Sequence, residues 1–246
     1  MSSIDYCRSA LTSLKLKGML GNIDQILNEA QEQKISYLEC LKLFLETEIT
    51  DRNEKRLQRN LAGAHLPSLK ELESFDFTRI QGVDTSEINN LLDFRWVDNA
   101  ENILFLGPPG VGKTHLSISL ALKALERGYK VCFERASNLV KLLKTSDIHR
   151  SSAFRINRIL KSSILIIDEI GYTPIDRKEA NLFFNLISEL YERTSIIITS
   201  NKGFDQWAEM MGDEIMTTAM LDRLLHHAHA FSIDGDSYRI LKNKEE

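Results

Sequence analysis

The chain has 246 residues with a formal net charge of −4, 43% hydrophobic residues and 27% charged residues. These values are typical of a globular protein with a sizeable core. They exclude a uniformly basic nucleic-acid binder, so any contact with nucleic acid must come from a local patch. The three cysteines, Cys7, Cys40 and Cys132, have no paired spacing, which argues against a disulfide framework or a cysteine-based zinc site.

The start of the sequence, "MSSIDYCRSA", lacks the basic-then-apolar pattern of a signal peptide. The longest strongly apolar runs, such as "ILII" at 164–167, are far too short to span a bilayer. We therefore expect a cytoplasmic protein without a membrane partner.

Residues 1–66 are predicted to form a small all-α N-terminal domain. Apolar side chains recur at helical spacing between Leu11 and Leu27. Within this stretch, Gly18 and Gly21 predict a break between two short helices.

A long helix is predicted to complete this domain. Ser36 and Glu39 fit a capping box, in which the hydroxyl and the carboxylate each accept a hydrogen bond from a free backbone N–H. The helix should begin at about Tyr37 and end near Gly63, because Pro67 beyond it cannot continue a helix.

Residues 67–101 are predicted to be a packed connector, with one short helix near 86–94 and no run rich in Gly and Ser. From residue 102 to residue 246, strand patterns alternate with helical patterns. This alternation predicts an α/β fold, with a parallel sheet flanked by helices on both faces. The predicted strands are 102–106, 129–134, 163–167, 194–199 and 229–233. The predicted helices between them are 113–127, 137–145, 152–160, 177–192 and 214–227.

The sequence "GPPGVGKT" matches the phosphate-binding pattern G-x-x-x-x-G-K-[ST], with a predicted strand before it and a predicted helix after it. Glycines allow the backbone N–H groups to point inward at phosphate oxygens, and the helix adds its positive dipole end. Lys113 should reach the β- and γ-phosphates of ATP, and the Thr114 hydroxyl should ligate Mg²⁺. The predicted nucleotide-binding segment is Gly107, Pro108, Pro109, Gly110, Val111, Gly112, Lys113, Thr114 and His115. The rings of His115 and Trp207 are interpreted as packing side chains.

Polar residues follow two further predicted strands. In "SILIIDEIGY", Asp168 and Glu169 end a buried strand, and in "SIIITSN", Asn201 does the same. Ligands of open α/β sheets lie beyond the carboxyl ends of the strands. Asp168 is therefore placed to hold Mg²⁺, Glu169 to polarise a water for attack on the γ-phosphate, and Asn201 to orient that water. Alone, "DE" after an apolar strand is usually a solvated loop, and Asn201 alone would be a loop-capping residue. The combination with the phosphate loop indicates a site.

The three motifs together resemble an AAA+ ATPase. The segments "LGPPGVGKTHLSISLALKAL", "ILIIDEIGYTPIDRKEANLFFNLISELYER", "IIITSN" and "LDRLLHHAHAFSIDGDSYR" resemble the IstB family, ATP-binding helper proteins of a class of bacterial insertion sequences. They are also similar to DnaC, the loader of the replicative helicase. The resemblance covers almost the whole chain and implies a P-loop NTPase (AAA+) fold. With thirteen residues after 233, we expect no helical lid domain, so nucleotide should be gripped mainly at subunit interfaces.

The resemblance also implies roles for single residues. Arg223 in "LDRLL" matches an arginine finger that reaches the ATP of a neighbouring subunit, and Arg239 in "SYR" matches an arginine that senses nucleotide in its own subunit. Phe75 and Phe77 in "SFDF" match the segment that packs the adenine. The alternative for these two phenylalanines is that they are simple core aromatics of the connector.

A basic stripe on the predicted long helix is a candidate DNA contact. Arg52, Lys55, Arg56 and Arg59 lie at i, i+3, i+4 and i+7, which is one helix face. A solvated face paired with Asp51 and Glu54 is the alternative, and the family resemblance favours DNA. A second basic group between the second and third predicted strands includes Arg155 and Arg158. In related loaders and initiators, this insert faces a channel that holds DNA.

The sequence "HHAH" contains His226, His227 and His229. Adjacent histidines on a helix point in different directions, and no cysteine or acidic ligand completes a site. We therefore predict no metal site here, apart from the Mg²⁺ that accompanies ATP.

These features predict an ATP-dependent DNA-binding regulator of insertion-sequence transposition. Such a protein would assemble as a homo-oligomer on duplex DNA with ATP, present that DNA to a partner transposase, and reset by hydrolysing ATP. A helicase loader of the DnaC type is the alternative, with a preference for single strands. A small-molecule kinase would need an acceptor pocket, and a switch that only binds ATP would not need Lys113 and Glu169 together.

Overall fold

The computed structural model describes residues 2–172 and 175–238. The chain forms two compact units, Met1–Arg59 and Asn60–Glu246. Among the described residues, none of the helices is both long and apolar enough to cross a membrane.

The first unit is helical. It contains α1 (Ser3–Ser13), α2 (Lys17–Glu32) and most of α3 (Tyr37–Ala64). The prediction of a break at Gly18 and Gly21 is wrong, because both glycines lie inside α2 and the chain turns before it.

Gly18 serves helix packing rather than a break. A Cβ at Gly18 would lie 2.8 Å from the carbonyl oxygen of Thr47 on α3, so only glycine allows this close approach. The buried carboxylate of Glu48, also on α3, accepts hydrogen bonds from the backbone N–H groups of Gly18 and Met19 at 2.8 and 3.2 Å. A side chain of α3 thus caps the first turn of α2.

Helix α3 begins and ends where the sequence predicts. The Ser36 hydroxyl accepts a hydrogen bond from the backbone N–H of Glu39 at 3.2 Å, which is one half of the predicted capping box. The helix ends at Ala64, shortly before Pro67.

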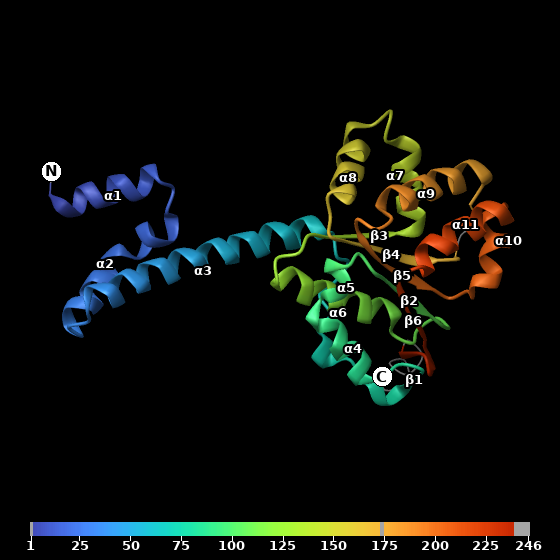
Figure 1. The fold of residues 1–246 in the computed structure, drawn as a ribbon, viewed down its shortest axis with the longest axis horizontal. Helices are drawn as coiled ribbons and strands as arrows, with labels where there is room; N and C mark the ends of the chain where they lie inside the picture. Colours follow the sequence, from blue (N-terminus) through green and yellow to red (C-terminus); the bar gives the residue numbers. More distant parts are fainter. Residues whose placement is uncertain (1, 173–174, 239–246) are drawn as a thin grey trace, which may run out of the picture. The chain divides into compact units, whose positions relative to one another are not determined.

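A five-stranded parallel sheet forms the centre of the second unit (Figure 1). The strand order is β3-β4-β5-β2-β6. All five strands lie within a few residues of the predicted ones, which confirms the α/β fold. They are β2 (Asn102–Leu106), β3 (Val131–Arg135), β4 (Ile164–Ile170), β5 (Ser195–Ser200) and β6 (Ala228–Ser232).

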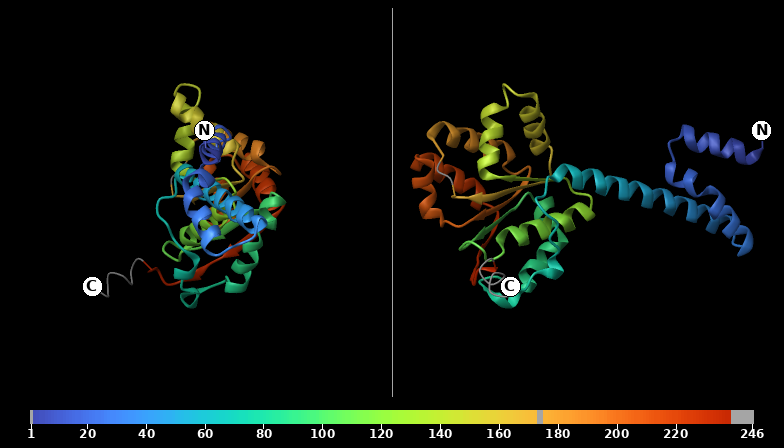
Figure 2. Two further views of the ribbon diagram at one scale, coloured as in Figure 1. Left: turned by 90° about the vertical axis from the view of Figure 1, so that its left-hand side faces the viewer. Right: turned by 180° about the vertical axis from the view of Figure 1, so that it is seen from behind.

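Helices cover both faces of this sheet. Helix α6 (Lys113–Glu126) packs on one face, and the five α-helices that follow it in the chain pack on the other (Figures 1 and 2). Their apolar side chains join those of the strands in one buried core that includes Trp207, which is fully buried as predicted. These helices are α7 (Ala136–Thr145), α8 (Arg150–Leu160), α9 (Arg177–Leu190), α10 (Trp207–Met211) and α11 (Glu214–Leu225).

The segment before the sheet is packed, as predicted. Its Phe94 and Trp96 are almost completely buried, and the Trp96 indole N–H donates to the Leu91 carbonyl at 2.9 Å. Strand β1 (Ile80–Gln81) pairs antiparallel with β7 (Asp234–Gly235), which brings residues near 80 next to residues near 235. The helical turns are η1 (Leu72–Ser74), η2 (Phe77–Arg79), α4 (Thr85–Asn90), η3 (Leu91–Asp93) and α5 (Arg95–Asp98).

Candidate nucleotide-binding site

The phosphate-binding loop connects β2 to the first turn of α6. Gly110 and Gly112 have φ angles of 91° and 99°, values that disfavour other residues. A Cβ at Gly112 would lie 2.4 Å from the Phe75 ring, so this position has no room for a side chain. The Lys113 ammonium donates hydrogen bonds to the carbonyls of Gly107 and Pro108 at 2.6 and 2.7 Å. The loop is thus curled around the lysine that the sequence assigns to the phosphates.

Asp168 and Thr114 come together from different elements. The Thr114 hydroxyl at the start of α6 donates to the Asp168 carboxylate on β4 at 2.8 Å. The Thr199 hydroxyl on β5 donates to the same carboxylate oxygen at 2.7 Å, and Asp168 is only 2% exposed. Hard oxygen ligands of this kind are what Mg²⁺ prefers. The residues present therefore fit the metal that accompanies a nucleoside triphosphate.

Glu169 lies in an irregularity of β4. Ile167 pairs with Ile198 and Ile170 with Ser200, so β4 has one residue more than β5 over this interval. Glu169 has a φ of 63°, and its backbone N–H donates to the Thr199 hydroxyl at 2.9 Å. Because of the extra residue, the Asp168 carboxylate is buried whereas the neighbouring Glu169 carboxylate is partly exposed at the end of the strand.

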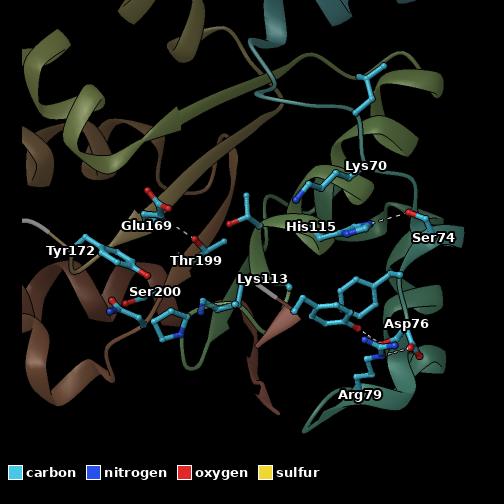
Figure 3. A pocket seen from close by; sticks show the side chains of 18 residues that line it. Lys70, Ser74, Asp76, Arg79, Lys113, His115, Glu169, Tyr172, Thr199 and Ser200 are labelled. Carbon is cyan, nitrogen blue, oxygen red and sulfur yellow. Dashed lines mark hydrogen bonds and ion pairs between the residues drawn. The ribbon is translucent and has the colours of Figure 1, made fainter. Parts of the chain in front are cut away.

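A cavity of about 580 Å³ lies next to the loop. Its wall includes Lys113, Thr114, Glu169 and Asn201, which the sequence places in the nucleotide site (Figure 3). The Asn201 side-chain oxygen is buried and has no hydrogen-bond partner within the described part of the chain. A buried amide oxygen without a donor can accept a hydrogen bond from a ligand or a water molecule in the cavity.

Aromatic side chains form the other end of this cavity. Phe75 lines it and contacts the His115 ring edge-on, with ring centroids 5.1 Å apart. Phe77 packs against Phe75 with centroids 4.7 Å apart and does not belong to the lining. Tyr238 also lines the cavity, and its backbone N–H donates to the Gly110 carbonyl at 3.1 Å.

His115 combines packing with cavity lining. Its Nε2 lies 2.9 Å from the Glu71 carbonyl, which requires the proton on that nitrogen. Partial burial lowers the pKa of the His115 imidazole, although the hydrogen bond to Glu71 opposes this effect. A neutral ring is therefore favoured beside Phe75.

Three residues at or next to the site, Thr199, Arg135 and Tyr238, are not predicted from the sequence. The Thr199 hydroxyl bonds the Asp168 carboxylate and the Glu169 backbone, and the signal for it is a polar side chain directly after the apolar run 196–198. Arg135, at the end of β3, is register partner of Asp168 and lies 3.6 Å from the Glu169 carboxylate. Arg135 and Tyr238 carry no local signal, because their relation to the site depends on strand order.

Arg223 does not line this cavity. On α11, its guanidinium donates to the Ala219 carbonyl at 2.8 Å and lies 5.0 Å from the centre of the Phe184 ring. A partly exposed guanidinium away from its own subunit's cavity is compatible with the finger role that the resemblance implies. Arg239, the other implied arginine, lies outside the described residues.

The predicted basic stripe is exposed along α3. Arg52 pairs with Glu48 and Lys55 pairs with Asp51, both at 2.7 Å. Arg56 and Arg59 continue the stripe on the same face, and the Arg59 side chain donates to the Lys55 carbonyl at 3.1 Å. Two of the four cations are therefore partly neutralised by their own helix.

The structure contradicts a DNA contact by Arg155. This residue is 6% exposed, and its guanidinium pairs with the buried Glu134 carboxylate. It also donates to the carbonyls of Gly63 and Phe133, both at 2.9 Å. Arg155 joins the end of α3 to β3 and has a structural role. Arg158 is only half-buried and stays a candidate.

The parallel sheet, the loop after β2 and the acidic pair on β4 define a P-loop protein of the AAA+ class. The solved DnaI structure matches with a TM-score of 0.57 and 19% identity, covering 67% of this chain and 91% of that chain. The DnaC helicase loader matches with a TM-score of 0.54 and 19% identity, covering 67% and 96%. At these identities, the likeness shows a common fold.

The sequence comparison is more specific. The model of the family described as IstB-like ATP binding protein matches residues 9–246. The ATP-binding protein of insertion sequence IS21 from Pseudomonas aeruginosa is 40% identical over 235 residues, 96% of this chain and 89% of that protein. The corresponding protein of IS5376 from Geobacillus stearothermophilus is 40% identical over 240 residues, 98% and 94%. The chain therefore belongs to the IstB-like ATP-binding family, which confirms the resemblance.

Proposed function

We propose that this protein is an ATP-dependent, DNA-binding regulator of insertion-sequence transposition. The observation that carries the proposal is that Lys113, Thr114 and Glu169 line one cavity, with Asp168 hydrogen-bonded to Thr114, in a chain whose relatives are insertion-sequence ATP-binding proteins. In this proposal, the protein assembles on duplex DNA with ATP, delivers that DNA to a transposase, and resets by hydrolysis.

ATP would occupy the cavity with its phosphates at the loop. The Lys113 ammonium would leave its two carbonyl partners to bind the β- and γ-phosphates, and the loop N–H groups would contact the phosphate oxygens. Thr114 and Asp168 would hold Mg²⁺, which supplies positive charge beside the phosphates. Phe75 would pack against the adenine, with Phe77 supporting it from behind.

Hydrolysis would use Glu169 and Asn201. Glu169 is partly exposed at the cavity and would accept a proton from the attacking water. The Asn201 side-chain oxygen at the same cavity has no partner among the described residues, so it would orient that water. Thr199 would keep the Glu169 backbone in place.

The active assembly would be a homo-oligomer with ATP sites between subunits. Arg223 does not line its own cavity, which supports a role on the ATP of a neighbour. We propose that 102–246 is the ATPase domain and that 67–101 carries its adenine-pocket segment. Arg239 would sense nucleotide in its own subunit.

DNA contact is assigned to the helical N-terminal domain, residues 1–66. Its stripe of Arg52, Lys55, Arg56 and Arg59 is exposed and follows one helix face, which suits a phosphate backbone. Arg158 of the second unit is a further candidate contact. A replicative helicase loader is the alternative function, and the DnaC likeness supports it at the level of the fold.

The first test uses the Glu169→Gln protein, which should remain in its ATP state. Its affinity for duplex and single-stranded DNA is measured with ATP and with ADP, at two salt concentrations. Tight duplex binding that needs ATP and weakens with salt is the expected result. A preference for single strands, or no DNA binding at all, would favour the loader.

A matched variant tests the basic stripe. Arg56→Ala and Arg59→Ala together should weaken duplex binding and reduce the salt slope by about one per arginine. Lys15→Ala, in the turn before α2, is the control and should leave the slope unchanged. An unchanged slope in the Arg56/Arg59 variant would remove the stripe from the DNA contact.

A further inference from the structure

Three metal-ligating side chains meet on the surface of the second unit, away from the nucleotide cavity. They are Glu192, His226 and His227, and one ligand atom from each lies within 4.8 Å of the other two. Glu192 follows the end of α9, whereas the two histidines follow the end of α11. The folded chain thus supplies an acidic ligand from outside the "HHAH" segment, which corrects the prediction that no acidic ligand completes a site.

The backbone positions of these ligands are determined by the core. Leu190 and Leu224, which precede the two turns, are each 1% exposed and belong to the same buried cluster. Helices α9 and α11 are therefore packed together close to the ligands. Because both turns are anchored, the three side chains do not depend on a flexible loop for their proximity.

The histidine rings already lie close to one another. The centroids of His226 and His227 are 4.0 Å apart, and the Nδ1 atom of His226 is 4.0 Å from the Glu192 carboxylate. The Tyr191 hydroxyl is hydrogen-bonded to the same Nδ1 at 2.7 Å. One nitrogen cannot hold both partners: Zn²⁺ at Nδ1 would displace the Tyr191 hydroxyl, whereas Zn²⁺ at Nε2 would leave this bond as the outer hydrogen bond that orients the ring.

We propose that Glu192, His226 and His227 form a binding site for Zn²⁺. Two imidazoles and one carboxylate are a zinc ligand set, with a fourth position left for water. Ligand atoms around a tetrahedral zinc are about 3.3 Å apart. All three residues are exposed, so small rotations of their side chains close the present separation without moving the backbone.

The third histidine of the motif is not part of this site. His229 lies on β6 and is paired with Glu101, with 2.8 Å between Nε2 and the carboxylate. It is a surface histidine of the same segment with a different partner. It therefore provides a matched control for any loss of metal binding.

The position of the site has a consequence for Arg223. Glu192, His227 and Arg223 line the same small surface hollow. A bound Zn²⁺ would add positive charge beside the Arg223 guanidinium. Electrostatic repulsion would then disfavour conformations in which the guanidinium lies close to the metal. Zn²⁺ at this site is thus expected to act on the face that carries Arg223, not on the nucleotide cavity.

The test is Zn²⁺ binding by the full chain without a histidine tag or nucleotide. A chromophoric chelator competes for Zn²⁺, and excess Mg²⁺ occupies the oxygen ligands near Asp168. One Zn²⁺ per chain is expected, and Co²⁺ in its place should give the intense visible absorption of a tetrahedral site. His226→Ala, His227→Ala and Glu192→Gln should each lower Zn²⁺ affinity at least about tenfold, whereas His229→Ala should leave it unchanged.

Folding of each variant is checked without metal by circular dichroism and thermal unfolding. Since the three ligands are exposed, the variants should unfold with the wild-type midpoint. Unaltered Zn²⁺ affinity in a folded His226→Ala or His227→Ala protein would overturn the proposal. So would an equal loss in His229→Ala, because binding would then be a general property of surface histidines.

Discussion

The Arg135 guanidinium lies 3.6 Å from the Glu169 carboxylate, across the ends of β3 and β4. Both side chains are partly exposed, so the pair is worth at most about 1 kcal/mol. The contact holds the proposed general base toward β3. An interaction of this strength is readily exchanged when ATP or a partner offers Glu169 another position.

Replacing Arg135 should therefore increase hydrolysis without DNA. In Arg135→Ala, Glu169 loses its partner, and we expect basal ATP turnover to rise by up to about fivefold, with ATP affinity unchanged. Phosphate release is the measurement, and Arg135→Lys is the control that keeps the charge. Slower turnover in Arg135→Ala would instead indicate that Arg135 assists the reaction.

Lys113→Ala should abolish ATP binding. The variant removes the ammonium and its charge-assisted hydrogen bonds to the phosphates, so affinity should fall at least about hundredfold. Titration with a fluorescent ATP analogue measures this loss. Lys123→Ala changes a lysine of the same helix that pairs with Glu73, and it should bind like wild type. Equal affinity in Lys113→Ala would refute the phosphate assignment.

Glu169→Gln should separate binding from hydrolysis. Glutamine keeps the size of the side chain but cannot take a proton from water, so turnover should fall by about 10² to 10⁴. Calorimetric titration should show unchanged ATP affinity. Turnover at the wild-type rate would mean that another group is the base.

Arg223→Ala should bind ATP and lose hydrolysis, by about a thousandfold, because the transition-state charge loses a guanidinium. Mixing this variant with Glu169→Gln places an intact Arg223 beside an intact Glu169 at some interfaces. Turnover should then partly recover. If no ratio of the two proteins restores phosphate release, Arg223 does not act in trans.

Arg155→Ala should destabilise the protein rather than weaken DNA binding directly. Its removal leaves the buried Glu134 carboxylate without its ion-pair partner, with Asn138 still donating to it, and takes the arginine donor from two carbonyls. This should cost about 3–5 kcal/mol of unfolding free energy. Urea denaturation measures the loss, and Arg158→Ala on the same helix is the control with a smaller effect. A stable Arg155→Ala protein with a reduced DNA salt slope would restore the DNA role.

The sequence alone determines those sites whose residues all lie in one continuous segment of the chain. The loop from Gly107 to Thr114 is one continuous segment, so its spacing alone indicates phosphate binding. The alternation of strands and helices likewise predicts the parallel sheet, and the rule that ligands lie beyond strand ends brings Asp168 and Asn201 to the loop. These inferences need helical and strand periodicity but not the order of the strands.

Tertiary structure alone decides contacts between segments that are distant in the chain. Arg135 reaches Glu169 because β3 pairs with β4, and Glu192 reaches His226 because α9 packs on α11. Tertiary packing also buries Arg155 against Glu134, although the sequence alone predicts an exposed cation at this position. Sequence periodicity describes which residues share a face of one element. What that face meets depends on packing, and packing determines whether a charge contacts water, a partner or the core.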